Sequence, residues 1–336
     1  MHPLSKRSVP VVLSMIFLLL PAAGWSQARK AAKYPAKPTD LIVAAAPGAG
    51  TDTVARMVAG YASKRFGVPV NVVNVTGASG VTGTLQVMRA APDGYNLLVD
   101  GNFTSSFMFA TRTDLPAKLE DRTFVARVTT DYVYFFCNAG TGWKTLEEAL
   151  QSARSRPEEF RWGAGLYGST PMFTQIDLFL AAGMNMEKIK KTRMVVFEKG
   201  NAPSMQACIT GDVQFAVGMS ADVASLLATK RVRVLAVNAP GRTKEYPDVP
   251  TTKELGYPEA DLMPWYGISG PKGLPEPVVK AWDDLIRGAA KDPEAQAAAA
   301  KALKTWRYLP PAEYKASILK EYEQIISVAS ALGIRR

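Results

Sequence analysis

The chain has 336 residues, of which 47% are hydrophobic, 21% charged and 9% aromatic. This composition is typical of a globular protein and excludes a disordered, collagen-like or coiled-coil chain. Lys and Arg number 40 against 30 Asp and Glu, and the single histidine is His2. The body of the chain therefore cannot build Ser-His-Asp or Cys-His catalysis, or a zinc site on histidine. At roughly 100–200 residues per domain, the length predicts two domains.

The first 28 residues have the pattern of a signal peptide. Lys6 and Arg7 precede an apolar run over 11–20, and small residues end in Ser26-Gln27-Ala28. We expect cleavage after Ala28 and export of the rest. A membrane anchor is the alternative, but the run is about half of the ~20 residues that cross a bilayer. In an oxidising compartment Cys137 and Cys208 could form a disulfide or remain buried thiols, and the sequence leaves both open.

The first part of the chain alternates between segments with the apolar pattern of a strand and segments with that of a helix. Strands are predicted at 41–46, 70–75 and 95–99. A helix capped by Thr51 or Asp52 and ended by Gly67 separates the first two, and a helix at 84–90 separates the next two. Strand-helix-strand-helix-strand order predicts a parallel sheet covered by helices.

The remainder continues this alternation. Strands are predicted at 132–137, 160–163, 194–197, 213–217 and 232–238. Between them we expect helices that open at a capping box over 145–148, at Pro171, at Pro203 and at Ala221. A Pro- and Gly-rich stretch over 240–277 holds one strand at 265–268, and helices follow at 277–291, 293–306 and 311–332.

Glycines and hydroxyls occupy three strand-to-helix junctions, over 47–52, 163–170 and 199–204. The first amides of a helix have no partner within the helix, and its dipole places about half a positive charge there. Such loops suit a carboxylate or a phosphate, and in open α/β sheets they meet at the carboxyl ends of the strands. Each glycine could equally serve only a tight turn. Two loops from different halves of the chain that face one cleft make a stronger prediction.

The second junction also contains the dinucleotide pattern G-x-G-x-x-G, at Gly163, Gly165 and Gly168. An NAD-dependent oxidoreductase is therefore an alternative. The acid expected about 20 residues later is poorly placed, because Glu187 precedes the next strand and Glu198 is too distant. The first junction lacks the lysine of a P-loop, and the chain has no G-x-S-x-G motif.

Four segments recur together in one known family. They are Tyr34-Pro35-x-Lys37-Pro38, Pro47-Gly48-Ala49-Gly50-Thr51-Asp52, Ala91-Pro92-Asp93-Gly94-Tyr95 and Pro247-Asp248-Val249-Pro250-Thr251. With this ordered set the chain resembles the tripartite tricarboxylate transporter substrate-binding proteins, also called Bug proteins, from about Tyr34 to Ile334. No single one of the four motifs is specific.

The resemblance implies an α/β, type II periplasmic-binding-protein fold, with two α/β lobes around a central ligand cleft. Lobe 1 would comprise 29–130 and 250–336, and lobe 2 would comprise 131–249. The family pattern carries the ligand site onto the junctions and the cleft edge, at Gly48, Ala49, Gly50, Thr51, Asp52, Ala78, Ser79, Thr104, Gly165, Leu166, Tyr167, Gly168, Ser169, Thr170, Lys199, Gly200, Asn201 and Ala202.

The chain departs from the family pattern where polar side chains are usual. Met172 and Phe173 follow Thr170-Pro171 where a histidine is common, Phe197-Glu198 replaces a tyrosine before Lys-Gly, and a strand ends in Gly218-Met219 instead of Asp-Asn. We therefore expect a ligand with one carboxylate and an apolar or aromatic remainder. Tyr167, Met219 and Trp265 would line that part, and ordinary core packing is the alternative for each.

The resemblance further implies a periplasmic, monomeric solute receptor that is not an enzyme and uses no cofactor, metal or nucleic acid. Its partners would be a small carboxylic acid and the membrane subunits of a transporter. A chemosensory receptor of the same fold is an alternative that the sequence does not separate from transport.

Overall fold

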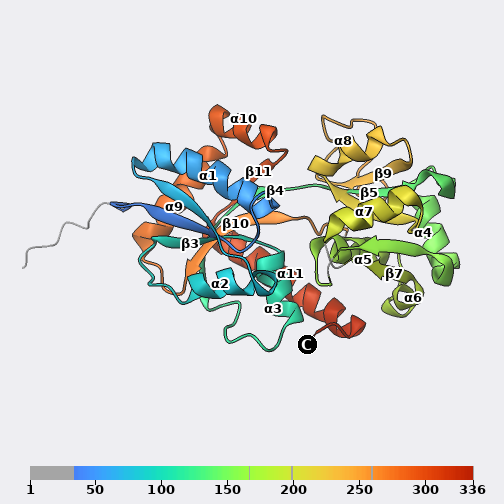
Figure 1. Cartoon of the computed structure of the whole chain (residues 1–336), viewed down its shortest axis with the longest axis horizontal. Helices are drawn as coiled ribbons and strands as arrows, with labels where there is room; N and C mark the ends of the chain where they lie inside the picture. Colours follow the sequence, from blue (N-terminus) through green and yellow to red (C-terminus); the bar gives the residue numbers. More distant parts are fainter. Residues whose placement is uncertain (1–33, 166, 198–199, 259, 336) are drawn as a thin grey trace, which may run out of the picture. The chain divides into compact units, whose positions relative to one another are not determined.

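The computed structural model describes residues 34–165, 167–197, 200–258 and 260–335, which form one compact unit. The unit contains two β-sheets with helices packed on them (Figure 1). The predicted signal peptide at 1–28 lies outside the described residues. None of the described helices is both long and apolar enough to cross a bilayer.

The first sheet has six strands in the order β11-β4-β10-β3-β1-β2. Its strands are β1 (Thr39–Val43), β2 (Val70–Asn74), β3 (Asn96–Gly101), β4 (Arg122–Thr130), β10 (Trp265–Pro271) and β11 (Thr305–Leu309). The predicted parallel pairing is confirmed for β1 with β2 and β3. β10 runs antiparallel to β3 and β4, and β11 is antiparallel to β4. The helices that follow or precede these strands are α1 (Gly50–Phe66), α2 (Val81–Met88), α3 (Met108–Thr111), α9 (Glu276–Ala289), α10 (Pro293–Lys301) and α11 (Pro311–Leu332).

The second sheet has five strands in the order β7-β6-β8-β5-β9. They are β5 (Val133–Asn138), β6 (Arg161–Ala164), β7 (Arg193–Val196), β8 (Phe215–Met219) and β9 (Val232–Asn238). Its helices are α4 (Leu146–Ser155), α5 (Thr170–Ala181), α6 (Met186–Lys191), α7 (Asn201–Thr210) and α8 (Ser220–Ala228). β6 is parallel to β7 and β8, whereas β5 is antiparallel to β8 and β9.

The chain passes between the two sheets twice, after β4 and before β10. At these crossovers the Asp131 amide donates to the Pro264 carbonyl at 2.9 Å. The buried Asp131 carboxylate also forms an ion pair with Lys304, whose side chain is only 7% exposed. The two connections are therefore tied to each other and to the α10–β11 loop of the first sheet.

Helix α11 packs on both sheets. Tyr314 and Ile318 in its first turns belong to a cluster with Phe124 of β4. Ile325, Val328 and Ala329 in its last turns join the core of the second sheet. Figure 1 shows this helix, in red, running from the first sheet toward α5 and α6. The helix was predicted with these bounds, but its contacts with both cores were not.

Two predicted details are wrong, and one strand was missed. The helix predicted over 293–306 ends at Lys301, and Trp306 lies instead in β11 with its indole donating to the Ala295 carbonyl at 2.9 Å. The alanine-rich run favours a helix, but the residues of β11 that follow it pair with β4 as a strand. β4 itself was not predicted. The N-cap of α1 is Ala49 rather than Thr51 or Asp52.

The two cysteines are buried free thiols. Cys137 contacts the Trp143 carbonyl at 3.8 Å and Cys208 the Gln214 carbonyl at 3.7 Å. Burial raises the pKa of both thiols above the ordinary range. Of the two possibilities that the sequence left open, the structure selects inert thiols over a disulfide.

Candidate ligand site

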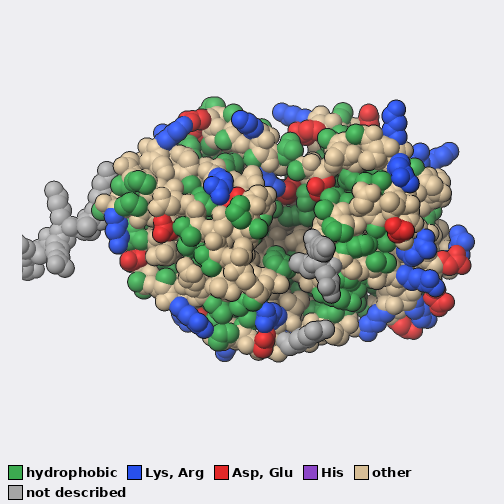
Figure 2. Space-filling model, viewed as in Figure 1, with side chains coloured by type: hydrophobic (Ala, Val, Ile, Leu, Met, Phe, Trp, Pro, Cys, Tyr) green, Lys and Arg blue, Asp and Glu red, His purple; other side chains and the backbone are tan. Residues whose placement is uncertain are grey.

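A cavity of about 450 Å³ lies where strands of both sheets end. Its wall comes from the loops after the carboxyl ends of β1, β2, β3, β6, β7 and β8, from Pro264 of the second crossover, and from Trp265 and Tyr266 at the start of β10. Figure 2 shows the surface hollowed in the middle of the molecule, with hydrophobic side chains inside the hollow. The volume suits a small organic molecule.

Three helices present both their N-cap residue and their first residue to this cavity. α1, α5 and α7 have 17, 12 and 10 residues, and the N-cap residues Ala49, Ser169 and Gly200 make no side-chain capping hydrogen bond. Their first-turn amides therefore remain available to a ligand, and each dipole contributes partial positive charge. Apart from Tyr266, no titratable side chain lines the cavity among the described residues. Among the described residues, backbone amides and helix ends are thus the main source of positive potential at the cavity.

Two buried polar side-chain atoms of the cavity wall have no hydrogen-bond partner among the described residues. They are Ser169 Oγ and Asn201 Oδ1. The Asn201 amide nitrogen donates to the Val217 carbonyl at 2.9 Å, which orients this side chain. Buried polar groups are normally paired. Unpaired groups beside two open helix ends indicate a place for a polar ligand or water.

Asp52 supports the first loop instead of facing the cavity. Its carboxylate accepts from the Gly48 amide at 2.9 Å, from Arg56 Nε at 2.9 Å and from Asn74 Nδ2 at 3.0 Å. The hydrogen bond from Arg56 is the main cause that lowers the pKa of Asp52 to about 2. The ionised side chain therefore stabilises the β1–α1 loop that presents Ala49, Gly50 and Thr51 to the cavity.

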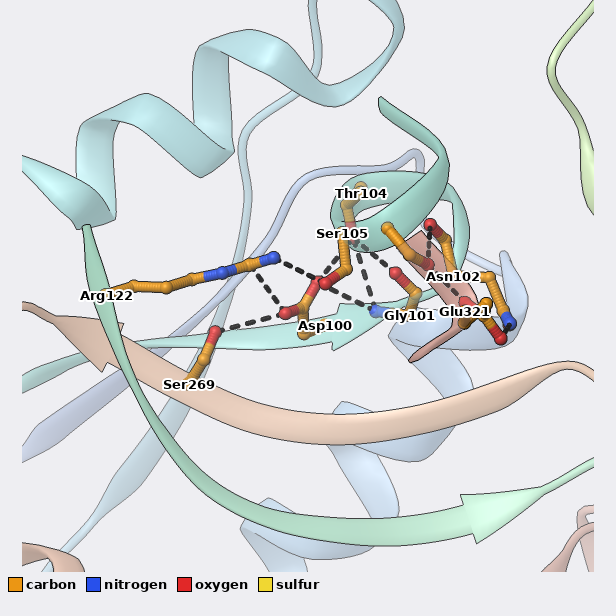
Figure 3. A network of polar contacts seen from close by, with 9 residues as sticks. Asp100, Gly101, Asn102, Thr104, Ser105, Arg122, Ser269 and Glu321 are labelled. Atoms are coloured by element: carbon orange, nitrogen blue, oxygen red, sulfur yellow. Dashed lines mark hydrogen bonds and ion pairs between the residues drawn. The ribbon is translucent and has the colours of Figure 1, made fainter. Parts of the chain in front are cut away.

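The loop after β3 is held by a buried ion pair. Arg122 Nη1 donates to Asp100 Oδ2 at 2.6 Å, with both side chains at most 1% exposed. The other Asp100 oxygen accepts from the Gly101 amide and from Thr104 Oγ1, both at 2.9 Å, and Arg122 also contacts Ser105 (Figure 3). Since Gly101 and Thr104 line the cavity, this network fixes one side of its wall.

Trp265 and Tyr266 form the wall on the crossover side. The Trp265 amide donates to Asn102 Oδ1 at 2.8 Å, and the indole donates to the Glu321 carboxylate. Lys304 Nζ lies 5.1 Å from the centre of the Tyr266 ring. A Cβ at Gly50 would lie 2.3 Å from Tyr266 Oη, so the glycine allows this ring to pack against the start of α1.

Most of the predicted site residues line the cavity. Those that do are Ala49, Gly50, Thr51, Ser79, Thr104, Gly165, Ser169, Thr170, Gly200, Asn201, Met219 and Trp265. Those that do not are Gly48, Asp52, Ala78, Tyr167, Gly168 and Ala202. Leu166 and Lys199 lie outside the described residues. Tyr167 is 58% exposed and, with Gly168, lines an adjoining hollow that shares Ser79 and Phe103 with the cavity.

Sequence reasoning missed several lining residues, among them Asn102, Phe103, Pro264 and Tyr266. Two signals could have identified them. Asn102 and Phe103 lie three and four residues after the strand predicted at 95–99, at the end where ligands bind in α/β sheets. Tyr266 is the neighbour of Trp265, which was chosen.

The three glycines of the dinucleotide pattern have other structural roles. A Cβ at Gly163 would meet Ser204 Oγ of α7 at 2.3 Å, and one at Gly165 would meet Ser169 Oγ at 3.3 Å. Gly168 has a φ of +72°, which favours glycine in a turn. Helix packing and turn geometry account for these glycines without a pyrophosphate.

Comparison with known families identifies the chain's relatives. A profile of the tripartite tricarboxylate transporter family receptor matches residues 54–307. The chain belongs to this receptor family. BugT from Bordetella pertussis is 29% identical over 272 residues, which cover 80% of this chain and 81% of that protein. A UPF0065 protein from Agrobacterium vitis is 29% identical over 262 residues, which cover 77% and 73%.

Solved structures share the receptor fold. A TctC solute-binding protein from Polaromonas superposes with a TM-score of 0.70 at 26% identity, over 88% of this chain and 99% of that one. MatC from Rhodopseudomonas palustris, solved with bound malate, superposes with a TM-score of 0.69 at 24% identity, over 88% of this chain and 100% of that one. A second R. palustris protein, solved with adipate, gives 0.72 at 21% identity over 89% and 98%. The predicted family and fold class are confirmed.

Proposed function

We propose that this member of the receptor family captures a small carboxylic acid in the cavity, without catalysis, and delivers it to the membrane subunits of a transporter. The observation that carries the proposal is the convergence of three uncapped helix ends and the unpaired Ser169 hydroxyl on one cavity. The malate and adipate of the two R. palustris structures are likewise small carboxylic acids. The predicted signal peptide and the family support a periplasmic location.

The apolar part of the wall supports a ligand with an apolar remainder. Micromolar affinity corresponds to about −8 kcal/mol, whereas each helix end supplies only about 0.3–2 kcal/mol. Burial of apolar ligand surface, at about 25 cal/mol per Å², would have to supply much of the difference. Ala44, Phe103, Met219 and Trp265 offer such surface.

Ligand binding would close the cavity about the two crossovers. The wall combines loops from both sheets, so a ligand that touches them all favours the closed arrangement. The proposed moving lobes are 29–130 with 250–336, and 131–249. Because the last turns of α11 pack in the core of the second sheet, this helix would have to bend or slide during closure.

Substitution of Ser169 by Asp tests the proposal. The new carboxylate would stand against the ligand's carboxylate, and we expect at least tenfold weaker binding, about 1.4 kcal/mol. Native mass spectrometry of freshly purified protein would identify a co-purified acid, and calorimetry would measure its affinity. Ser225→Asp, which adds the same charge on the exposed face of α8, is the control. Equal affinity in Ser169→Asp and wild type would contradict the site.

A further inference from the structure

Glu321 on α11 accepts hydrogen bonds from two residues of the ligand cavity wall. Its two carboxylate oxygens accept from Trp265 Nε1 at 3.1 and 3.0 Å, and one of them accepts from Asn102 Nδ2 at 2.8 Å. Ser106 Oγ donates to the other oxygen. Figure 3 shows Glu321 beside Asn102, at the opposite end of the β3 loop from Asp100 and Arg122.

The partners of Glu321 belong to the cavity wall, but Glu321 does not. Trp265 and Asn102 line the ligand cavity. Glu321 and Trp265 line a second cavity of about 440 Å³ on the other side of the crossover, which we term the rear cavity. Asn102 Oδ1 accepts from the Trp265 amide, so Asn102, Trp265 and Glu321 form a closed hydrogen-bonded ring. The ring holds both the main chain and the indole of Trp265.

We infer that Glu321 is a positioning residue of the ligand site, which sets the orientation of Trp265 and Asn102 without touching the ligand. This inference rests on the proposed function for its effect on affinity. The donors explain why an acceptor is needed at this position, because an indole and an amide NH₂ can only donate. Hydrogen bonds to an ionised acceptor are also about twice as strong as neutral ones.

The hydrogen bonds that Glu321 accepts from Trp265 and Asn102 should respond to pH. Burial raises the pKa of Glu321 to about 7. The hydrogen bonds from Ser106, Trp265 and Asn102 and the charge of Arg127 act in the opposite direction but are weaker than the effect of burial. Protonation of the Glu321 carboxylate places an O–H donor among the three donors Ser106, Trp265 and Asn102. The Ser106 hydroxyl must then turn to accept a hydrogen bond, and the bonds from Trp265 and Asn102 weaken because the acceptor is no longer charged. The other charged groups of the rear cavity wall are Arg307 of β11, Lys320 of α11, and Lys253 and Asp261 of the second crossover.

The indole N–H signal of Trp265 provides a test that needs no ligand. In protein labelled with ¹⁵N-tryptophan, and with the signal assigned by Trp265→Phe, we expect a titration near pH 7 between about pH 5.5 and 8.5. Glu321→Gln should abolish the titration, because its amide can accept from Trp265 and donate to Ser106 but carries no charge. A Trp265 signal that does not titrate in the wild type would overturn the inference.

Two further variants separate this role from a general effect on folding. Ser106→Ala removes one donor but keeps the charge, and Ser106 does not line the ligand cavity, so the midpoint should move to higher pH. In Glu323→Gln, an exposed substitution on the same helix, the Trp265 indole signal should titrate as in the wild type. Should Glu321→Gln fail to fold, an unchanged midpoint in Ser106→Ala would still overturn the inference.

Adipate serves as the probe for the effect on affinity. By calorimetry, wild-type affinity should be about three- to tenfold weaker at pH 6 than at pH 8, and Glu321→Gln should bind equally weakly at both. Adipate bound equally well by Glu321→Gln and wild type at both pH values would overturn the role in ligand binding. If no carboxylate binds to the wild type, the proposed function fails, and the indole titration still decides whether Glu321 positions Trp265.

Discussion

Gly50 illustrates how one residue can control the ligand cavity. It is the first residue of α1, it lines the cavity, and the space of its missing side chain is taken by the Tyr266 hydroxyl. Burial raises the pKa of Tyr266, so its hydroxyl stays protonated at neutral pH. The α1 amides and the Tyr266 ring can approach each other only because this position is glycine.

Gly50→Ala should therefore impair binding more than folding. The methyl group would lie 2.3 Å from Tyr266 Oη, so the ring or the start of α1 must shift, and both belong to the cavity wall. We expect carboxylate affinity to fall at least tenfold, about 1.4 kcal/mol, in calorimetry. Gly60→Ala on the same helix has no atom within 4 Å of the new methyl group. This control should keep its affinity and gain about 0.5–1 kcal/mol of stability. Equal affinity in both variants would contradict the proposed contact.

At the scale of elements, the junction of α5, α11 and the second crossover carries another buried acid. Asp177 of α5 is 7% exposed. One carboxylate oxygen accepts from Gln324 Nε2 of α11 at 2.8 Å, and the other accepts from the Leu262 amide at 3.1 Å. Burial is the largest cause that raises the pKa of Asp177 from 3.8 to about 7. The two hydrogen bonds only partly offset the cost of burying the charge.

The pKa of Asp177 predicts how stability depends on pH. The folded state holds this proton more tightly than the unfolded state, so the stabilisation is complete below about pH 4 and is lost as pH rises through about 7. Asp177→Asn removes this dependence, which amounts to at most about 4 kcal/mol at about 1.4 kcal/mol per pKa unit. Urea unfolding from pH 4 to 8 should give a flatter profile for Asp177→Asn than for wild type or exposed Asp248→Asn. Parallel profiles would rule out this assignment.

At the scale of the whole molecule, the cavity exists because loops of two separate sheets meet beside the crossovers. The first sheet takes its strands from 39–130 and 265–309, and the second takes its strands from 133–238. A ligand in contact with both sets of loops should favour the arrangement in which they are closest, by its difference in affinity for the two states.

Small-angle X-ray scattering should detect this closure. Saturation with the carboxylate found by mass spectrometry should decrease the radius of gyration of the wild type. Ser169→Asp should show a smaller decrease at the same ligand concentration, and it should need at least tenfold more ligand to match the wild type. If the saturated wild type scatters identically to the ligand-free protein, then binding occurs without closure and the proposed lobe movement is wrong.

The sequence by itself determined the class of fold and the position of three loops that line the cavity. Periodicity and glycine placement located most strands and helices, and the loops over 47–52, 163–170 and 199–204 each contribute residues to the cavity wall. These signals are local, because helix starts, turns and buried strands depend on neighbouring residues. The ordered motifs were sufficient to identify the family.

Only the tertiary structure decided which side chains face the cavity and what holds them. Asp52 turned out to support a loop, Tyr167 lies outside the cavity, and Trp306 belongs to a strand. Glu321 reaches Asn102 and Trp265 across 219 and 56 residues of sequence. Such contacts depend on how distant elements pack, and a single sequence carries no local pattern for them.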